Sequence, residues 1–280
     1  MVFLMSTNML LYMYMMPLLE QPGCPICRVR NMAETRYLGN LLHEYVNDLE
    51  TRVHIIASLG YCPKHAWQMG LMEREKDGEA TGNSIIYEDL VSVVLNLLLQ
   101  YEREYKARKH KIKPWFFNIP NGLRGQPVDP PDEPYGPMIK NKCRVCQIGE
   151  NNEENYLELM LEDFSQSESR LRDKYLQSDG LCLFHLRQSL KLKKPALQNG
   201  VHFLVEHRLE TLPKLCQDLR NYTDKHAWNR HTEEMTPDER VAWIRAIRFF
   251  AGNEGNLLLQ DLAGIPADDR ENKSTTRKYD

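Results

Sequence analysis

The sequence lacks a marked excess of charge of either sign. Its 36 Lys and Arg residues stand against 39 Asp and Glu residues, which gives a formal net charge of -3. Such a chain has no overall attraction for nucleic acid or for an anionic membrane, so either partner would have to be drawn by a local patch. The hydrophobic content of 42% over 280 residues is typical of a soluble globular protein with one large or two ordinary domains.

Long hydrophobic runs are also scarce. The apolar run from Met9 to Leu19 is too short to cross a bilayer, contains Pro17, and is not preceded by the Lys or Arg of a signal peptide. We interpret residues 1–22 as an apolar extension. It results either from a start codon assigned too far upstream or from a helix that packs on the core. We expect no other stretch of membrane-spanning length, no membrane partner, and a cytoplasmic location.

The alternation of apolar and polar residues that is typical of strands is missing, which predicts an all-α fold. Missing too are a Gly-rich phosphate loop, a nucleotide fingerprint and a Ser-His-Asp order. His202 and His207 are five residues apart and do not share a helical face, unlike the histidines of a zinc-hydrolase helix. His202 and Glu206 do share one and predict an ordinary hydrogen-bonded pair. Enzyme activity therefore has no positive signal.

What the sequence does contain is a duplicated arrangement of cysteine and histidine. Cys24-x-x-Cys27 is followed after 34 residues by Cys62-x-x-His65, and Cys143-x-x-Cys146 is followed after 35 residues by Cys182-x-x-His185. The segments 82–105 and 199–222 can also be laid beside each other. These correspondences indicate an internal repeat.

The repeat sets the expected domain organisation. The segment between the copies is rich in proline, which excludes a helix and predicts a linker. The last residues are polar and predict a partly disordered tail. The expected divisions are the apolar N-terminal extension (1–22), the first helical repeat (23–112), the Pro-rich linker (113–140), the second helical repeat (141–230), a C-terminal helix (231–255) and the tail (256–280).

Helical signals recur at matching places in the two copies. Gly60 and Gly180 suit the left-handed end of a helix, and Thr236 and Glu239 form a capping box before a helix that stops at Gly252. Apolar residues at 3.6-residue spacing mark buried faces between the ligand pairs and along the next helix. These are Leu38, Leu41, Leu42, Tyr45 and Leu49; Tyr156, Leu157, Met160, Leu161 and Phe164; and Ile86, Leu90, Val94, Leu97, Tyr101 and Tyr105.

A Cys-x-x-Cys pair can bring both sulfurs to one ion, and a Cys-x-x-His pair supplies two more ligands. We therefore predict that each repeat is clamped by its own Cys3His metal site. Four protein ligands leave no open position, which is the structural pattern, and mixed sulfur and nitrogen ligation suits zinc. An iron–sulfur cluster fits less well because most clusters take four thiolates. The predicted ligands of the two zinc ions are Cys24, Cys27, Cys62 and His65, and Cys143, Cys146, Cys182 and His185.

Thiol chemistry is the alternative use of these residues. The stretch CPIC is similar to the Cys-Pro-x-Cys of glutaredoxin-like active sites, whose first thiolate attacks a disulfide. Those motifs need a βαβ neighbourhood, and the second copy reads CRVC without the proline. A metal- or thiol-dependent redox enzyme or sensor at one of the sites is therefore the second hypothesis. Cys216 is interpreted as a buried small apolar residue.

The stretch YKARKHKIKPWFF places cations beside aromatic residues, a composition that can hold phosphates and stack on bases. Cations at the end of a long helix also stabilise its negative C-terminal end without any ligand. Contact with nucleic acid is therefore one of two interpretations. The residues concerned are Lys106, Arg108, Lys109, Lys111 and Lys113.

The combination of CPIC, GYCPKHAW, CRVC, GLCLFH and WIRAIRFFAG resembles an uncharacterised family of bacterial proteins that carry this paired pattern in an all-helical chain. The resemblance runs from about Gly23 to Gly252 and implies an architecture without an activity. We expect a non-enzymatic, zinc-stabilised helical scaffold that binds a protein partner or, as the alternative, nucleic acid.

Overall fold

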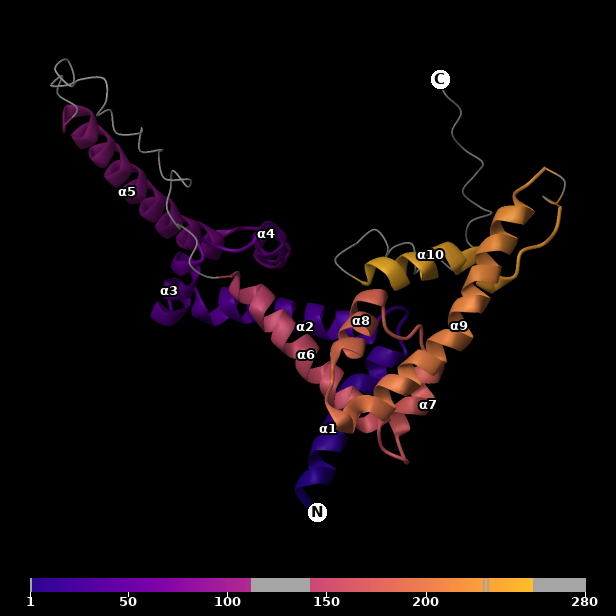
Figure 1. The fold of residues 1–280 in the computed structure, drawn as a ribbon. Helices are drawn as coiled ribbons and strands as arrows, with labels where there is room; N and C mark the ends of the chain where they lie inside the picture. The colour runs from indigo at the N-terminus through magenta and orange to yellow at the C-terminus, as the bar shows by residue number, and fades with distance from the viewer. Residues whose placement is uncertain (1, 112–141, 229, 231, 254–280) are drawn as a thin grey trace, which may run out of the picture. The chain divides into compact units, whose positions relative to one another are not determined.

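The computed structural model describes residues 2–111, 142–228, 230 and 232–253. Every regular element in these ranges is helical (Figure 1), which confirms the all-α prediction. The predicted linker at 113–140 and the predicted tail at 256–280 lie outside the described residues.

The helices follow the order of the chain. A π-helical turn at Leu41–Tyr45 continues α2, and a 3₁₀ turn at Pro195–Leu197 precedes α9. The α-helices are α1 (Val2–Leu19), α2 (Pro25–Asn40), α3 (Leu49–Ala57), α4 (Pro63–Asp77), α5 (Thr81–Lys111), α6 (Arg144–Phe164), α7 (Arg170–Leu176), α8 (Leu183–Lys191), α9 (Gln198–Lys225) and α10 (Pro237–Ala251).

Local signals place several helix ends where the sequence predicted them. Thr236 caps α10 and completes the capping box with Glu239, and Gly252 ends the helix with a φ of 74°. Gly60, with a φ of 96°, follows the end of α3 and donates its amide to the Ile55 carbonyl, a left-handed conformation that glycine adopts at little cost. Gly180 also has a positive φ, 68°, but α7 already ends at Leu176, so Gly180 lies in the following loop and does not end the helix.

The chain forms two compact units. Unit 1 consists of Met1–Ala33 and Gly149–Asp280, and unit 2 consists of Glu34–Ile148. The boundaries fall inside α2 and α6, so each of these helices contributes residues to both units. Each unit thus combines parts of both sequence repeats, whereas the predicted divisions follow the order of the chain.

The core of unit 1 includes the N-terminal helix. Met15 of α1 is fully buried, and α1 packs on α7. Phe164 and Tyr175 meet edge to face in this core, with ring centroids 5.1 Å apart. Of the two interpretations of the apolar extension, the helix packed on the core is therefore confirmed. The predicted α6 stripe is buried except for the half-buried Tyr156.

The core of unit 2 is smaller and corrects two predicted stripes. Tyr45 and Leu49 are exposed, because the π-helical turn ends at Tyr45 and Asp48 caps a new helix by accepting a hydrogen bond from the Thr51 amide. Along α5, Tyr101 and Tyr105 are also exposed. The buried apolar members of this core are Leu38, Leu41, Ile55, Met69, Ile86, Leu90 and Val145.

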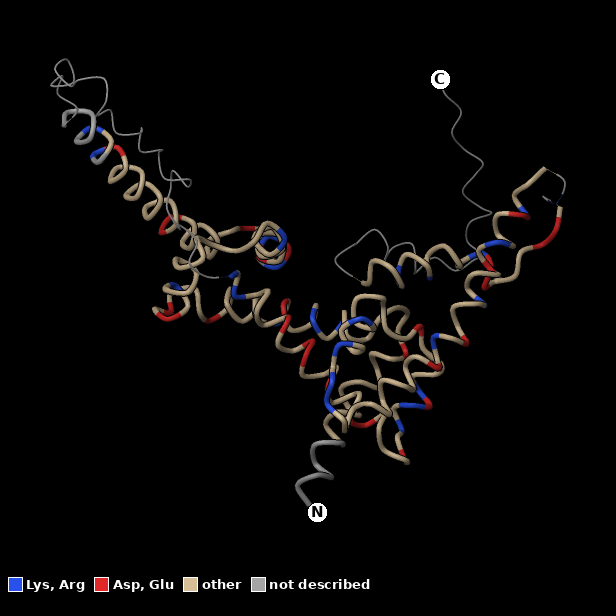
Figure 2. The backbone as a smooth tube through the Cα atoms, in the orientation of Figure 1, with Lys and Arg blue, Asp and Glu red and all other residues tan. Residues whose placement is uncertain are grey.

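Helix α5 holds one stretch, Thr81–Arg103, that is long and apolar enough to cross a membrane by length and composition, with 22% of its apolar window buried. This corrects the expectation that no stretch reaches that length. Its first turns belong to the core of unit 2, since Ile86 is buried and Asn83 donates to Glu73. Farther along, residues 91–101 carry no charged side chain (Figure 2).

Candidate metal centres

The eight predicted ligands come together in two groups of four, but not in the predicted pairing. We name each group after the helix that begins with its Cys-x-x-His pair. The α8 centre consists of Cys24, Cys27, Cys182 and His185, and the α4 centre consists of Cys62, His65, Cys143 and Cys146. Each centre therefore combines the Cys-x-x-Cys pair of one repeat with the Cys-x-x-His pair of the other, which corrects the expectation that each repeat closes its own site.

The lengths of the helices explain the exchange. In the first repeat, α2 and its π-helical turn cover residues 25–45, about 30 Å at 1.5 Å per residue, whereas the following α3 has 9 residues and covers about 14 Å. The shorter helix covers less than half of this length, so it does not by itself return Cys62 to the level of Cys24. The second repeat has the same imbalance, between α6 with 21 residues and α7 with 7 residues.

All four ligand pairs lie at helix starts. Cys62 and Cys182 are the N-cap residues of α4 and α8, and Cys24 and Cys143 directly precede α2 and α6. The positive end of a helix dipole favours a thiolate over a thiol, so this placement prepares the sulfurs to bind a cation.

The spacing of the donor atoms fits one tetrahedral ion in each centre. In the α8 centre, the sulfurs of Cys182, Cys24 and Cys27 lie 3.1, 3.3 and 3.5 Å from His185 Nδ1, and the sulfurs of Cys27 and Cys182 are 3.7 Å apart. Metal–sulfur and metal–nitrogen bonds of about 2.3 and 2.0 Å give tetrahedral edges of about 3.8 Å between sulfurs and about 3.5 Å between sulfur and nitrogen. A disulfide would need about 2.05 Å.

The α4 centre repeats this geometry. The sulfurs of Cys62, Cys146 and Cys143 lie 3.2, 3.4 and 3.6 Å from His65 Nδ1, and those of Cys62 and Cys146 are 3.6 Å apart. Three thiols and one imidazole at these separations can hold a metal ion in either centre.

A buried glutamate supports the histidine in each centre. His65 Nε2 lies 3.0 Å from Glu34 Oε2, and His185 Nε2 lies 3.2 Å from Glu153 Oε1. A carboxylate at this nitrogen fixes the ring orientation and leaves Nδ1 to face the ion, an arrangement common around zinc. Neither glutamate was among the residues predicted from the sequence. Both follow the second cysteine of a Cys-x-x-Cys pair by seven residues, which is the signal that identifies them.

This spacing gives α2 and α6 a double role. Helix α2 begins with two ligands of the α8 centre and carries Glu34, which supports the α4 centre. Helix α6 begins with two ligands of the α4 centre and carries Glu153, which supports the α8 centre. Arg30 reaches Glu153 at 3.1 Å and helps to hold that carboxylate in place.

The electrostatics of both centres favour a cation. Burial lowers the pKa of His65, but the thiol of Cys143 and the carboxylate of Glu34 outweigh this effect and raise the pKa to about 9. For His185, burial is likewise outweighed by Cys182, Cys27 and Glu153, and the pKa rises to about 11. Surroundings that hold a proton so firmly also favour a metal cation in its place, and acid opposes metal binding because the ligands must be deprotonated.

The two centres differ in how they are covered. All four donors of the α8 centre are buried, whereas the three cysteines of the α4 centre are half-buried. Gly252 at the end of α10 passes close to the α8 centre, since a Cβ atom there would lie 2.9 Å from Cys27 Sγ. The side-chain amide of Asn253 donates to the Cys24 carbonyl at 3.4 Å, and the backbone carbonyl of Asn253 accepts from the side-chain amide of Asn31. The end of α10 therefore closes this centre.

The other candidate residues do not form a site in the described part of the chain. Lys106 forms an ion pair with Glu102 on the same helix, at 2.7 Å. The side chains of Arg108, Lys109 and Lys111, and all of Lys113, lie outside what the structure describes.

His202 and Glu206 face solvent and lie 3.4 Å apart. His207 is buried against the Tyr175 ring, and burial together with the charge of Arg208 lowers its pKa to about 4. Cys216 is exposed, which corrects its interpretation as a buried residue. It lies on the face of α9 beside, not on, the one that buries Leu215.

The exchange of ligands predicts how fragments behave. Expressed separately, residues 1–111 and residues 142–280 should each hold only two of the four donors of either centre. Tight binding of two ions should therefore appear only when the fragments are mixed. Cobalt titration followed by thiolate-to-metal absorption measures this. As a control, Cys62→Ser in the first fragment should leave one tight site in the mixture. If residues 1–111 alone bound one ion with four protein ligands, the ligands would pair within the repeat and the exchange would be contradicted.

Gly252→Ala should weaken the α8 centre. The new methyl group meets Cys27 Sγ, and the backbone conformation, with a φ of 74° and a ψ of -163°, costs about 1–3 kcal/mol for a residue other than glycine. Competition with a chromogenic chelator should remove one ion early and leave the other. Gly78→Ala is the matched control, because Gly78 also has a φ of 73° but has open space around its Cβ position. Equal metal loss in both variants would contradict the close approach at Gly252.

Comparison with known proteins places this chain in a family. The chain is similar to a curated protein of Caldicellulosiruptor sp. (strain Rt8B.4) described as "Uncharacterized 23.9 kDa protein in xynA 3'region", with 24% identity over 235 residues, 84% of this chain and 98% of that protein. No solved structure matches. A family model described as "Family of unknown function (DUF6062)" matches residues 13–256. The chain therefore belongs to the DUF6062 family.

Proposed function

We propose that the protein is a non-enzymatic helical scaffold, stabilised by two structural zinc ions, that binds a protein partner. The observation that carries the metal part is the closed donor set of each centre. Three thiols and an imidazole fill a tetrahedron, and a buried glutamate fixes the imidazole. No position is left for water or substrate, which is the structural pattern for zinc.

Zinc is preferred to iron for three reasons. The donor separations fit a single ion, whereas a cluster with several irons would spread its ligands farther apart. Mixed thiolate and imidazole ligation suits zinc. A carboxylate behind the histidine is common in zinc sites. The seven cysteines, all of them free thiols, accord with a reducing compartment, so we propose a cytoplasmic location.

The partner part of the proposal is supported by an uncovered apolar stripe on α5. Val91, Leu95, Leu98 and Leu99 fall on one face of the helix and are 65, 54, 44 and 40% exposed. We call these residues the α5 stripe. Contiguous exposed apolar surface marks an interaction site in a folded protein. The first turns of α5 belong to the core of unit 2, and Asp89 in these turns forms an ion pair with Arg52 of α3. A protein surface therefore suits the stripe better than a bilayer.

The two alternative functions, a redox sensor and nucleic-acid binding, are each supported by one feature. The α4 centre has half-buried cysteines, which is where a redox sensor would react with an oxidant. The Lys- and Arg-rich sequence at the C-terminal end of α5 is the feature that supports nucleic-acid binding. Neither feature adds a substrate pocket or an open coordination position.

Metal and thiol analysis tests the scaffold. The purified protein should contain two zinc ions per chain and have no visible absorbance. A thiol reagent should label one cysteine, the exposed Cys216, until a strong chelator releases the other six, and Cys216→Ser should abolish the initial labelling. Iron with a brown colour, or rapid labelling of the α4 centre by reagent and its oxidation to disulfides by mild peroxide, would favour the redox alternative.

Photocrosslinking tests the partner. A photoreactive amino acid in place of Leu95 should give an adduct of discrete mass in the native host, and Leu98→Asp should abolish it by charging the stripe. Leu190, which is 53% exposed on α8, is the matched control and should give none. Adducts with lipid, or the same adducts from both positions, would contradict a protein partner at the α5 stripe.

A further inference from the structure

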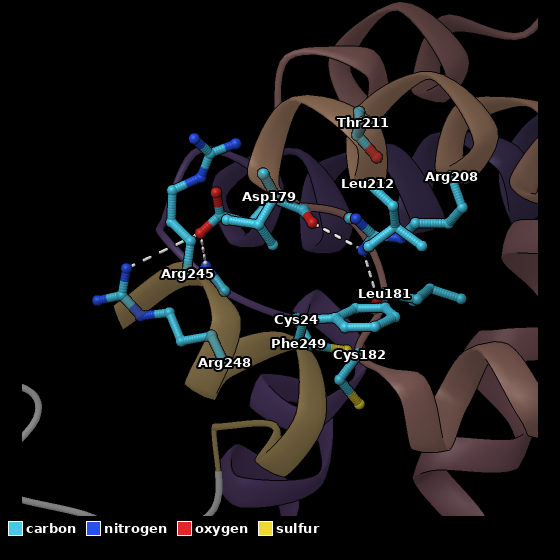
Figure 3. Close-up of a pocket in the computed structure, with 13 residues that line it drawn as sticks. Cys24, Asp179, Leu181, Cys182, Arg208, Thr211, Leu212, Arg245, Arg248 and Phe249 are labelled. Carbon is cyan, nitrogen blue, oxygen red and sulfur yellow. Dashed lines mark hydrogen bonds and ion pairs between the residues drawn. The ribbon is translucent and has the colours of Figure 1, made fainter. Parts of the chain in front are cut away.

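A small pocket in unit 1 opens beside the α8 centre and is lined by three arginines (Figure 3). Arg208 comes from α9, and Arg245 and Arg248 come from α10. The pocket holds about 30 Å³, room for a group the size of roughly two water molecules. Gly23, Cys24 and Cys182 line its inner side, and Leu212, Leu215 and Phe249 give it an apolar wall.

Arg208 is a fixed part of this pocket. It is only 8% exposed, donates to the carbonyls of Asp179 and Leu181, and stacks over the Phe249 ring with its guanidinium carbon 5.1 Å from the ring centre. Its Nε is buried and has no hydrogen-bond partner in the described part of the chain. Burying a guanidinium group costs free energy unless its donors are paired, so this orphaned donor points to an acceptor that the chain itself does not supply.

The other two arginines also have donors to spare. Arg248 approaches Asp179 at 3.8 Å, and Arg245 approaches Asp218 and Asp238 at 3.7 and 3.9 Å. These contacts are too long for hydrogen bonds, and within the described residues neither guanidinium makes a shorter one. Asp179, the one carboxylate in the lining, is already engaged, because its Oδ2 accepts from the Gly23 amide at 2.7 Å.

We propose that this pocket is a binding site for a small oxyanion, a phosphate or carboxylate group that Arg208 holds from within and toward which Arg245 and Arg248, whose guanidinium groups face away from Arg208 in Figure 3, turn on binding. Guanidinium groups present paired N–H donors that match the oxygens of both groups. Because the pocket has room for only about two water molecules, it can enclose one or two oxygens of such a group and leaves the rest of the ligand at its opening. Because the site draws on α9, α10 and the loop before α8, its ligand ties α10 to the elements that carry Cys182 and His185.

Calorimetric titration of the metal-loaded full chain tests the site, with inorganic phosphate and acetate as probes and ionic strength held constant with chloride. Saturable binding of either probe is expected. Arg248→Gln and Arg245→Gln should each weaken it about tenfold or more, since each removes charge-assisted hydrogen bonds. Arg240→Gln, on the exposed face of the same helix, should leave the affinity unchanged.

The two probes separate the possible ligands, since preference for phosphate indicates a phosphoryl group and preference for acetate a carboxylate. Arg248 also contacts Asp179, so the metal content of each variant is measured. If Arg248→Gln loses an ion, Arg245→Gln alone decides the result. No saturable binding of either probe, or equal weakening by Arg240→Gln, would overturn the proposal.

Discussion

The structure depends on how two short segments of chain are brought together at each metal centre. A Cys-x-x-Cys pair from one repeat and a Cys-x-x-His pair from the other meet at tetrahedral spacing. Neither repeat contains all four donors of one centre. A metal ion bound in either centre would therefore join segments that are distant in sequence, and it could stabilise the fold only when both repeats are present. The core of unit 2 is much smaller than that of unit 1, and limited apolar burial leaves a unit with little stability to lose.

Much of the architecture could be predicted from the sequence because its signals are local. Helical periodicity identified the fold class, Thr236 and Glu239 marked the start of α10, and Gly60 and Gly252 marked helix ends. The eight residues of the two candidate centres could be predicted from spacing and duplication. Chemistry of this kind is carried by residue type and short separations, which a sequence states directly.

The pairing of the ligands could not be predicted in the same way, because it depends on helix lengths. The apolar periodicity predicted one continuous helical face from Leu38 to Leu49, whereas the π-helical turn that continues α2 ends at Tyr45 and a new helix begins at Leu49. Asp48 and Ser169 cap the returning helices α3 and α7, and these two weak signals set how far the chain returns. The exposure of Tyr45, Tyr101 and Cys216 escaped prediction for a related reason. A helical face is buried only where another element covers it, and periodicity does not reveal where that cover stops.

The exchange of ligands also has a consequence for the order in which the protein can fold as it is synthesised. Cys24 and His185 are separated by 161 positions in the chain. At about 5–20 residues per second, the ribosome needs on the order of 10 s or more to cover that distance. During this time the first two cysteines have left the ribosome and have no partners with which to enclose an ion. The nascent chain must therefore carry unprotected thiols until nearly two thirds of it has been made, and the α4 centre, complete once Cys146 emerges, is the first that can close.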